Sequence, residues 1–402
     1  MNDTLQHLMQ EATRLTRSGQ LSEATAAIQR ALRGAAISPG AAQAQGARPD
    51  NISGDGASSQ VLEGCVFEID PAARDAAARA EVPSRPTPAT PAPPREAAAP
   101  GHFGSGSYTH ASLTRRYKLY LPPNAAAAAD VAAAAIPLVV MLHGCTQNAD
   151  DFAAGTDMNE RARAQGFAVL YPEQSRDANP SRCWNWFKHN HQRRDSGEPG
   201  LIASLTRAVI AEHGLDARRV YIAGLSAGGA MAAIVAAVYP DIFAAAGVHS
   251  GLPCGAASNV SEALAVMNTG AASAGGAAMK SARAANEASA PGAAVPTIVF
   301  HGDQDRTVHP RNGEQLVKAT LSASDAPAPV VERGISPRGQ RYTRSRYLDG
   351  QGRSVAEHWL LHGAGHAWSG GCTEGSYTDA NGADASGEML RFFFEHPLRG
   401  AH

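Results

Sequence analysis

One serine in this sequence has the neighbours that covalent catalysis requires. It is the centre of G-L-S-A-G at residues 224–228, a G-x-S-x-G pentapeptide. The β-branched and aromatic residues at 220–222 predict a short buried strand before it, and the alanine-rich run that must end by Pro240 predicts a helix after it. This order is typical of a nucleophile elbow, in which the glycines let strand and helix approach each other. We therefore expect Ser226 to be a nucleophile at the positive end of that helix.

A serine hydroxyl needs a general base, normally a histidine that a carboxylate orients. In the α/β-hydrolase order, the acid and then the histidine follow the serine at the ends of later strands. The predicted strand at 297–301 runs into G-D-Q-D-R-T-V, where Asp303 and Asp305 compete. We favour Asp305, because it holds the acid position of the H-G-x-x-D-x-x-V pattern, and we expect Asp303 to cap the turn.

The expected base lies in a glycine-rich loop that follows a later strand. His366 is in this loop, whereas His362 is expected to lie still within the strand. A loop of this kind can place an imidazole over a serine. Most of the 15 histidines are expected to be structural, and His366 is chosen for its order in the chain and for its loop.

Two backbone N–H groups are expected to form the oxyanion hole. One belongs to Ala227, the residue after the serine. The other belongs to Cys145, in the H-G-C loop that follows the predicted strand at 136–142. The Cys145 sulfur can be a buried thiol or half of a disulfide, since neither state conflicts with an amide that points into the site.

Three tryptophans lie in loops near these motifs. Trp184 and Trp186 belong to R-C-W-N-W at 182–186, and Trp368 follows His366 by two residues. Large aromatic side chains often line ligand clefts. We expect all three to contact the substrate, and a packed lid is the alternative for Trp184 and Trp186.

The elements that position these residues alternate between strand and helix. Strands are predicted at 116–121, 136–142, 167–171, 220–222, 244–249, 297–301, 341–348 and 357–362, and helices at 157–165, 201–213, 312–321 and 386–395, besides the one after the serine. Such alternation predicts a doubly wound, mainly parallel sheet of the α/β class. Ligands bind to such sheets at the carboxyl ends of the strands, where all the motifs above fall.

Seven motifs between residues 105 and 397 together resemble those of the polyhydroxybutyrate (PHB) depolymerase-type esterases, relatives of feruloyl and acetylxylan esterases. They are L-H-G-C-T-Q at 142–147, Y-P-E-Q-S at 171–175, C-W-N-W-F at 183–187, G-L-S-A-G-G at 224–229, H-S-G-L-P-C-G at 249–255, H-G-D-Q-D-R-T-V at 301–308 and G-A-G-H-A-W-S-G-G at 363–371. The resemblance implies an α/β-hydrolase fold and a serine esterase that acts on short-chain hydroxyalkanoate esters, polymer or oligomer, with no metal or organic cofactor.

The chain is predicted to have three parts. Residues 1–34 form an amphipathic helical arm, with apolar residues at helical spacing on both sides of Gly19. The arm docks on its own domain or on a partner, and a tetratricopeptide-like repeat is the alternative. Residues 35–104 are rich in Ala, Pro and Gly and predict a mostly disordered linker. Residues 105–398 form the catalytic domain.

Composition excludes several classes of function. A net charge of −2 gives no reason to expect a nucleic-acid partner. No two of the five cysteines have metal-ligand spacing, so no zinc site is expected, and one or two disulfides can form among the last four cysteines. No apolar run reaches the roughly 18 residues of a membrane span.

The expected location is cytoplasmic. The N-terminus shows no basic region followed by an apolar core, so no secretory signal is expected. Secreted depolymerases of the resembling type carry such a signal and a polymer-binding module. An extracellular enzyme is the alternative that the resemblance allows.

Two other functions compete with a depolymerase. One is a feruloyl or acetylxylan esterase, which would share the same catalytic residues. The other is a non-catalytic protein that binds a granule or a partner on a hydrolase scaffold, since a fold alone does not determine function.

Overall fold

The computed structural model describes residues 101–123, 135–270, 294–321 and 328–398. All of them belong to one compact unit, Pro91–His402. The arm predicted at 1–34 and most of the linker predicted at 35–104 lie outside the described residues. The last residues of the predicted linker are described. The first strand begins at His102, before the predicted domain boundary at Ser105.

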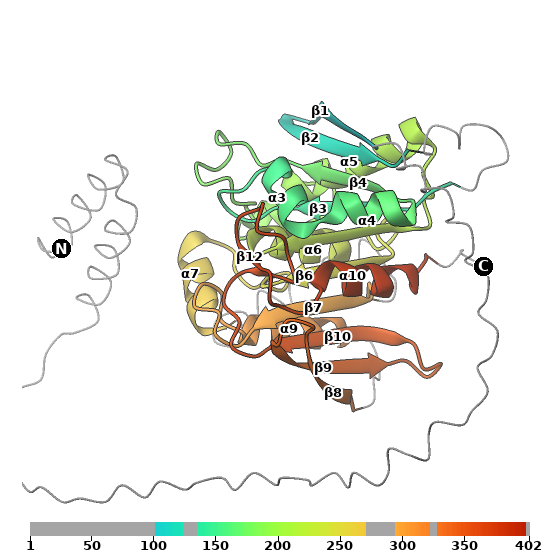
Figure 1. Cartoon of the computed structure of the whole chain (residues 1–402). Helices are drawn as coiled ribbons and strands as arrows, with labels where there is room; N and C mark the ends of the chain where they lie inside the picture. The colour runs from blue at the N-terminus through green and yellow to red at the C-terminus, as the bar shows by residue number, and fades with distance from the viewer. Residues whose placement is uncertain (1–100, 124–134, 271–293, 322–327, 399–402) are drawn as a thin grey trace, which may run out of the picture. The chain divides into compact units, whose positions relative to one another are not determined.

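A ten-stranded sheet organises the described residues (Figure 1). Its strand order is β1-β2-β4-β3-β5-β6-β7-β10-β9-β8. The strands are β1 (His102–His110), β2 (Leu113–Leu121), β3 (Leu138–Leu142), β4 (Ala168–Pro172), β5 (Val220–Leu225), β6 (Ala245–His249), β7 (Thr297–Gly302), β8 (Val330–Ile335), β9 (Arg341–Leu348) and β10 (Ser354–Leu361).

The centre of the sheet is parallel and its margins are antiparallel. Strands β4, β3, β5, β6, β7 and β10 pair in parallel, and the hairpins β1–β2 and β8–β9 flank them in antiparallel pairing. Every residue of β3, β5 and β6 is buried, as expected for near-continuous apolar strands that are covered on both faces. The predicted mainly parallel sheet is therefore confirmed.

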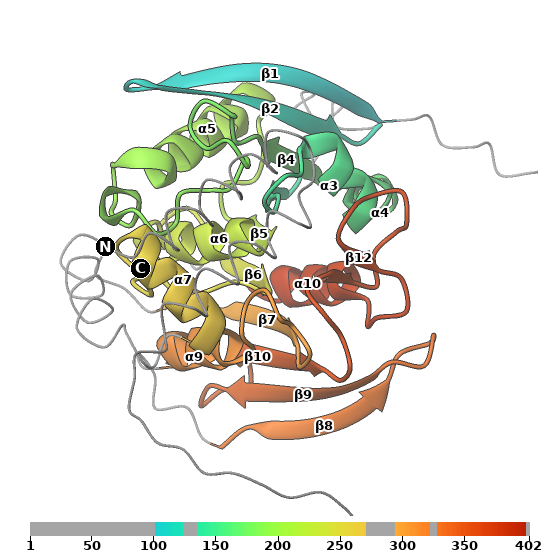
Figure 2. The same cartoon turned by 90° about the vertical axis from the view of Figure 1, so that its left-hand side faces the viewer.

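Helices cover both faces of the sheet (Figure 2). One face carries α5 (Gly197–His213), α6 (Ala227–Val238), α7 (Val260–Thr269) and α9 (Arg311–Leu321), and the other carries α3 (Ala149–Thr156), α4 (Met158–Gln165) and α10 (Ala385–Phe394). Two large clusters of buried side chains correspond to these two layers. This three-layer arrangement holds the carboxyl ends of the parallel strands at one rim, where the predicted motifs lie.

The prediction missed several elements. These are β1, β8, α3 and α7, together with a short parallel pair, β11 (Trp368–Ser369) and β12 (Thr378–Asp379). No described helix combines the length and the apolar character that a membrane crossing demands.

Candidate active site

Ser226 lies between β5 and α6 in a backbone conformation that L-residues rarely adopt. Its φ is 56° and its ψ is −119°. A side chain at Gly224 would come within 2.4 Å of the Gly228 carbonyl group, and one at Gly228 within 2.0 Å of the Leu142 carbonyl oxygen. Only glycine fits at these two positions, because the elbow packs directly against the end of β3. The strain is local to the serine and presents its hydroxyl at the N-terminus of α6.

A second cluster at the same rim joins Asp305 to His366. Asp305 follows β7, His366 follows β10, and the distance from His366 Nδ1 to Asp305 Oδ2 is 2.7 Å. The Asp305 side chain is fully buried, and that of His366 is 12% exposed. With Nδ1 facing the carboxylate, Nε2 is the nitrogen left to face a substrate. Within the described part of the chain, no hydrogen bond joins the Ser226 hydroxyl to this ring, a contact that is often loose without substrate.

The Asp305 carboxylate is held in its charged form. Burial opposes that form, but hydrogen bonds from His301 and His366 outweigh it and lower the pKa of Asp305 well below its usual range. The backbone N–H groups of Thr307 and Val308 also donate to Asp305 Oδ1, at 2.9 and 2.8 Å. A fixed negative charge at this position can orient an imidazole and stabilise its protonated form.

The two residues that compete with this pair bond to each other. Asp303 Oδ2 lies 3.0 Å from His362 Nδ1, and Asp303 Oδ1 accepts the Gly363 N–H at 2.8 Å. His362 Nε2 lies 2.8 Å from the Thr343 hydroxyl. His362 follows the last residue of β10, so its expected place within the strand is off by one residue.

Two buried histidines that the prediction did not single out lie behind the Asp305–His366 pair. His301 Nε2 is 2.8 Å from the Val308 carbonyl oxygen and 3.4 Å from Asp305 Oδ2. His249 accepts the Ser369 N–H through Nε2 at 3.0 Å. Burial, followed by repulsion from His301 and His366, lowers the pKa of His249 to about 3, so this ring is neutral. The H-G-x-x-D pattern could have identified His301, which is its first residue.

Hydrogen bonds fix the peptide of the expected oxyanion donor. Gly144 O and Cys145 N belong to one peptide group, and His143 Nδ1 lies 2.7 Å from Gly144 O. His143 Nε2 accepts the Gln174 N–H at 3.1 Å, which requires a neutral ring that donates through Nδ1. Burial favours this state because it lowers the pKa of His143. In the described residues, the Cys145 N–H has no hydrogen-bond partner, as an oxyanion donor requires.

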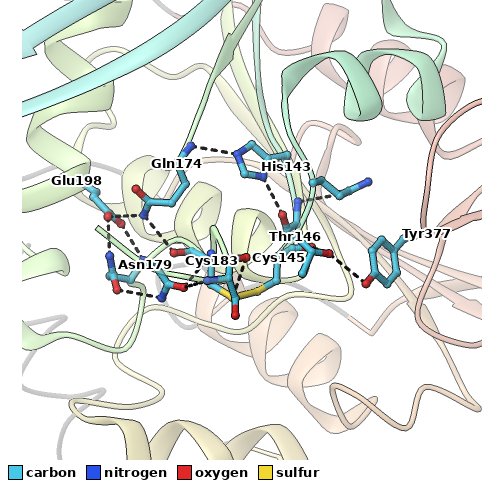
Figure 3. Close-up of a disulfide and its surroundings, with 12 residues drawn as sticks. His143, Cys145, Thr146, Gln174, Asn179, Cys183, Glu198 and Tyr377 are labelled. Atoms are coloured by element: carbon cyan, nitrogen blue, oxygen red, sulfur yellow. Dashed lines mark hydrogen bonds between the residues drawn. A yellow bond between two sulfur atoms is a disulfide. The ribbon is translucent and has the colours of Figure 1, made fainter. Parts of the chain in front are cut away.

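A disulfide joins Cys145 to Cys183 and ties this loop to its neighbour (Figure 3). The loop that contains Cys183 is held in turn by Glu198, a fully buried carboxylate in the first turn of α5. Glu198 accepts hydrogen bonds from the Asn185 backbone N–H and side chain, both at 2.8 Å, and from Arg115 at 3.3 Å. Burial alone would raise the pKa of Glu198. Hydrogen bonds from His191 and Gln174 outweigh this effect, so the pKa of Glu198 is lowered. The pairing of Cys145 with Cys183 had been left open by the sequence.

The far side of the oxyanion loop is held by the segment before β12. Gln147 accepts the Gly144 N–H at 2.9 Å and donates to the Ser376 carbonyl oxygen at 3.0 Å. The hydroxyls of Thr146 and Tyr377 lie 3.2 Å apart (Figure 3). The loop is thus restrained from both sides, by the disulfide and by these bonds.

The structure corrects the expectation that three tryptophans contact the substrate. Trp184 and Trp368 are 0% and 1% exposed, and Trp186 is 5% exposed. Trp184 packs against the His143 ring, and Trp368 stacks on His249 and donates from Nε1 to the Ser386 hydroxyl at 3.0 Å. These indoles therefore support the site from the core, because no face is left for a ligand.

The donor set offers no place for a metal ion. In the described ranges, no group of three or more His, Cys, Asp or Glu side chains is arranged to ligate one.

Comparison with known proteins identifies a family for this chain. A model of the family described as "Esterase PHB depolymerase" matches residues 115–325, just over half of the 402-residue chain. The matched range contains Ser226 and Asp305 and ends before His366.

Curated relatives include depolymerases, acetylxylan esterases and feruloyl esterases. Poly(3-hydroxyalkanoate) depolymerase C of Paucimonas lemoignei is 32% identical over 232 residues, which are 57% of this chain and 54% of the relative. Acetylxylan esterase A of Emericella nidulans is 31% identical over 140 residues, which are 35% of this chain and 43% of the relative. The chain thus spans about half the length of the curated relatives it matches.

A solved structure shares the fold. An acetyl xylan esterase from Aspergillus awamori superimposes with a TM-score of 0.56 at 19% identity, covering 72% of this chain and 99% of that one. This likeness supports an α/β-hydrolase fold. The family match, which covers just over half of the chain, shows that the chain belongs to the PHB depolymerase esterase family.

Proposed function

We propose that this protein is a serine carboxylic-ester hydrolase that cleaves short-chain hydroxyalkanoate esters through an acyl-enzyme. The observation that carries the proposal is the strained Ser226 elbow, at the same sheet rim as the bonded Asp305–His366 pair. A serine at φ 56° costs conformational energy, and strain of this kind is often retained where a hydroxyl must be presented to a ligand. Membership of an esterase family adds support from an independent direction.

The proposed reaction begins when the Ser226 hydroxyl oxygen attacks the ester carbonyl carbon. The hydroxyl proton passes to His366 Nε2, while Asp305 holds the Nδ1–H and stabilises the imidazolium. The C–O bond to the leaving alcohol then breaks as His366 returns the proton to the alcohol oxygen. Water repeats the sequence on the acyl-enzyme and releases the acid.

Charge that develops on the carbonyl oxygen is stabilised by the N–H groups of Ala227 and Cys145. Ala227 is the first residue of α6, where N–H groups lack intrahelical acceptors. The Cys145 amide is held by its peptide bond to Gly144 and by the disulfide. Preorganised donors of this kind lower the barrier because they need no rearrangement during the reaction.

The decisive test is Ser226→Ala. We expect the rate on p-nitrophenyl butyrate to fall by roughly 10⁴-fold or more, because the nucleophile is lost. Ser107→Ala, on the exposed side of β1, is the matched control. Retained turnover in the Ser226 variant would overturn the proposal. Labelling of the wild type by a fluorophosphonate probe separates an enzyme from a binding scaffold.

The substrate class is proposed from the depolymerase relative, and the acetylxylan esterase relatives supply the second candidate. A panel of hydroxybutyrate oligomers, acetylated xylan and methyl ferulate distinguishes them by kcat/KM. We expect the oligomers to be turned over best. A preference for acetylxylan or ferulate would keep the mechanism and change the substrate.

The compartment is proposed to be oxidising. The sequence favoured a cytoplasmic enzyme, but a Cys145–Cys183 disulfide is rare in a reducing cytosol and favours the extracellular alternative. Trapping thiols by alkylation in intact cells, followed by mass spectrometry, tests this point. A reduced pair in the cell would support the cytoplasmic location.

A further inference from the structure

A cavity outside the candidate triad lies where the β8–β9 hairpin meets the end of β10. Its volume is about 690 Å³, and its walls include Arg333, Ile335, Arg341, His362 and Asp303. None of these side chains takes part in the proposed hydrolysis. These two arginines differ from Arg344 and Arg346 of the same hairpin, whose guanidinium groups form ion pairs.

The strand register places the two arginines on one face. Arg333 pairs with Thr343, and Ile335 pairs with Arg341, so all four side chains project to the same side of the hairpin. His362 continues this face from the next strand, since its N–H donates to the Arg341 carbonyl oxygen at 2.9 Å. The arrangement therefore follows from the sheet and does not depend on one flexible side chain.

The charged side chains on the two faces of the hairpin differ in whether they form ion pairs. On the opposite face, Arg346 pairs with Glu332 at 2.8 Å and Arg344 pairs with Glu357 at 3.0 Å. Among the described residues, the Arg333 and Arg341 guanidinium groups have no ion-pair partner.

The one acid of the cavity does not neutralise these arginines. Asp303 is occupied by His362 and by the Gly363 N–H, at 3.0 and 2.8 Å. The Thr343 hydroxyl is likewise engaged by His362. The cavity therefore carries net positive charge with unused donors, which suits an anion and above all a planar carboxylate.

Aliphatic surface surrounds the positive charge. Ile335 is 66% exposed and Val331 is 51% exposed, and both lie on the same face as Arg333. Exposed aliphatic side chains next to unpaired guanidinium groups suit a ligand with an apolar body and a carboxylate end. A hydroxyalkanoate oligomer with a free acid terminus has this chemistry.

The cavity adjoins the candidate active site through two shared loops. Asp303 precedes Asp305 by two residues, and Gly363 precedes His366 by three. The loops are joined at their base, where the Gln304 N–H donates to the Ala364 carbonyl oxygen at 3.0 Å. A chain that crosses the triad can therefore continue along this rim towards the arginines.

We propose that Arg333 and Arg341 bind the terminal carboxylate of a hydroxyalkanoate oligomer whose ester is cleaved at Ser226. The inference rests on the proposed function and refines it, because it makes soluble free-acid oligomers the preferred substrate.

The test compares a hydroxybutyrate hexamer as free acid with its methyl ester, which has the same chain and no charge; the hexamer is needed because β9 lies four strands from β5, at about 4.8 Å per strand. We expect wild-type kcat/KM to favour the free acid by about tenfold, from charge-assisted hydrogen bonds to arginine. In R333Q/R341Q the ratio of the two values falls to near one. R346Q, which removes an arginine from the opposite face of the same hairpin, keeps the wild-type ratio. A wild-type ratio near one, or a ratio that the double variant keeps, overturns the inference.

A binding measurement separates failure of this inference from failure of the proposed hydrolysis. The Ser226→Ala protein is titrated calorimetrically with the free-acid hexamer and with its methyl ester. Tighter binding of the acid, lost in the triple variant with R333Q/R341Q, supports the arginine site even if no ester is hydrolysed. Equal binding of the two compounds overturns the site even if p-nitrophenyl butyrate is hydrolysed.

Discussion

Two His–Asp pairs lie side by side at the rim of this sheet, and they differ in what surrounds them. His366–Asp305 and His362–Asp303 come from the same two loops, after β10 and β7, with Nδ1–oxygen distances of 2.7 and 3.0 Å. In the first pair the carboxylate is fully buried, whereas in the second it is 31% exposed. A short His–Asp contact alone therefore does not identify a catalytic pair.

The far nitrogen of each imidazole makes the difference clearer. His362 Nε2 is bonded to Thr343, which lies within the regular strand β9. His366 Nε2 has no such partner among the described residues, and the hydroxyl at its rim belongs to a residue on a strained elbow. The pair with an uncommitted nitrogen, a buried acid and a nearby elbow is the one suited to proton transfer.

We expect the largest effect when each of the two acids is replaced by its amide in a separate variant. In Asp305→Asn we expect kcat on p-nitrophenyl butyrate to fall by about 10⁴-fold, because an amide no longer selects the Nδ1–H tautomer or stabilises the imidazolium. Asp303→Asn is the matched variant, and we expect kcat to fall by less than about tenfold, through looser loops alone. Steady-state kinetics measures both. A larger loss in the Asp303 variant would exchange the roles of the two pairs.

Loss of the disulfide is a second test, because it is expected to affect only the reaction at the His366–Asp305 pair. Cys145 is the expected oxyanion donor, and its sulfur is bonded to Cys183. In Cys183→Ser we expect kcat to fall by about tenfold to a hundredfold with little change in KM, because the donor amide is less well positioned. We also expect a loss of about 2–4 kcal/mol in the free energy of unfolding, which urea denaturation measures.

Cys372→Ser is the control for this change, since Cys372 is not part of the disulfide. We expect it to keep the wild-type kcat. If reduction or Cys183→Ser lowered stability but left kcat unchanged, the disulfide would be structural only. The Cys145 amide would then need another source of positioning.

The sequence predicted the centre of the sheet better than its margins. Strand β3 is a continuous apolar run, because both of its faces are buried. A run of this kind predicts a central strand directly from the sequence. The missed β1, H-F-G-S-G-S-Y-T-H, contains glycines and polar residues, and the missed β8 is almost wholly exposed. Each pairs only with the next strand along the chain and lies at an edge of the sheet, where exposure leaves little apolar alternation to detect.

The candidate site shows the same division. Strand order and the H-G-x-x-D pattern selected Asp305 and His366, which the fold brings within 2.7 Å. The pairing of His362 with Asp303 depends on the register that sets Leu361 opposite Gly302. Disulfide connectivity and the burial of the tryptophans likewise depend on three-dimensional packing, so sequence reasoning left the first open and misjudged the second.

The smallest expected effect is the acid dependence of stability, which distinguishes the two carboxylates by their surroundings. Burial opposes ionisation in both, yet hydrogen bonds lower the pKa of Asp305 and of Asp303. A carboxyl group with a lowered pKa stabilises the fold above its unfolded value of about 3.9, and this stabilisation is lost as the pH falls through the folded value. Each wild-type carboxylate should therefore stabilise the protein most near neutral pH.

We expect the difference in unfolding free energy between wild type and Asp305→Asn to be largest above about pH 5 and to shrink below about pH 4. For Asp303→Asn the same trend should be weaker, because this acid is partly exposed to solvent and accepts fewer hydrogen bonds. Urea denaturation at a series of pH values measures both differences. A difference for Asp305→Asn that stays constant or grows on acidification would mean that the buried acid is not held ionised. His366 would then face a neutral Asp305, whereas the comparison of the two pairs assigns a negative charge to this acid.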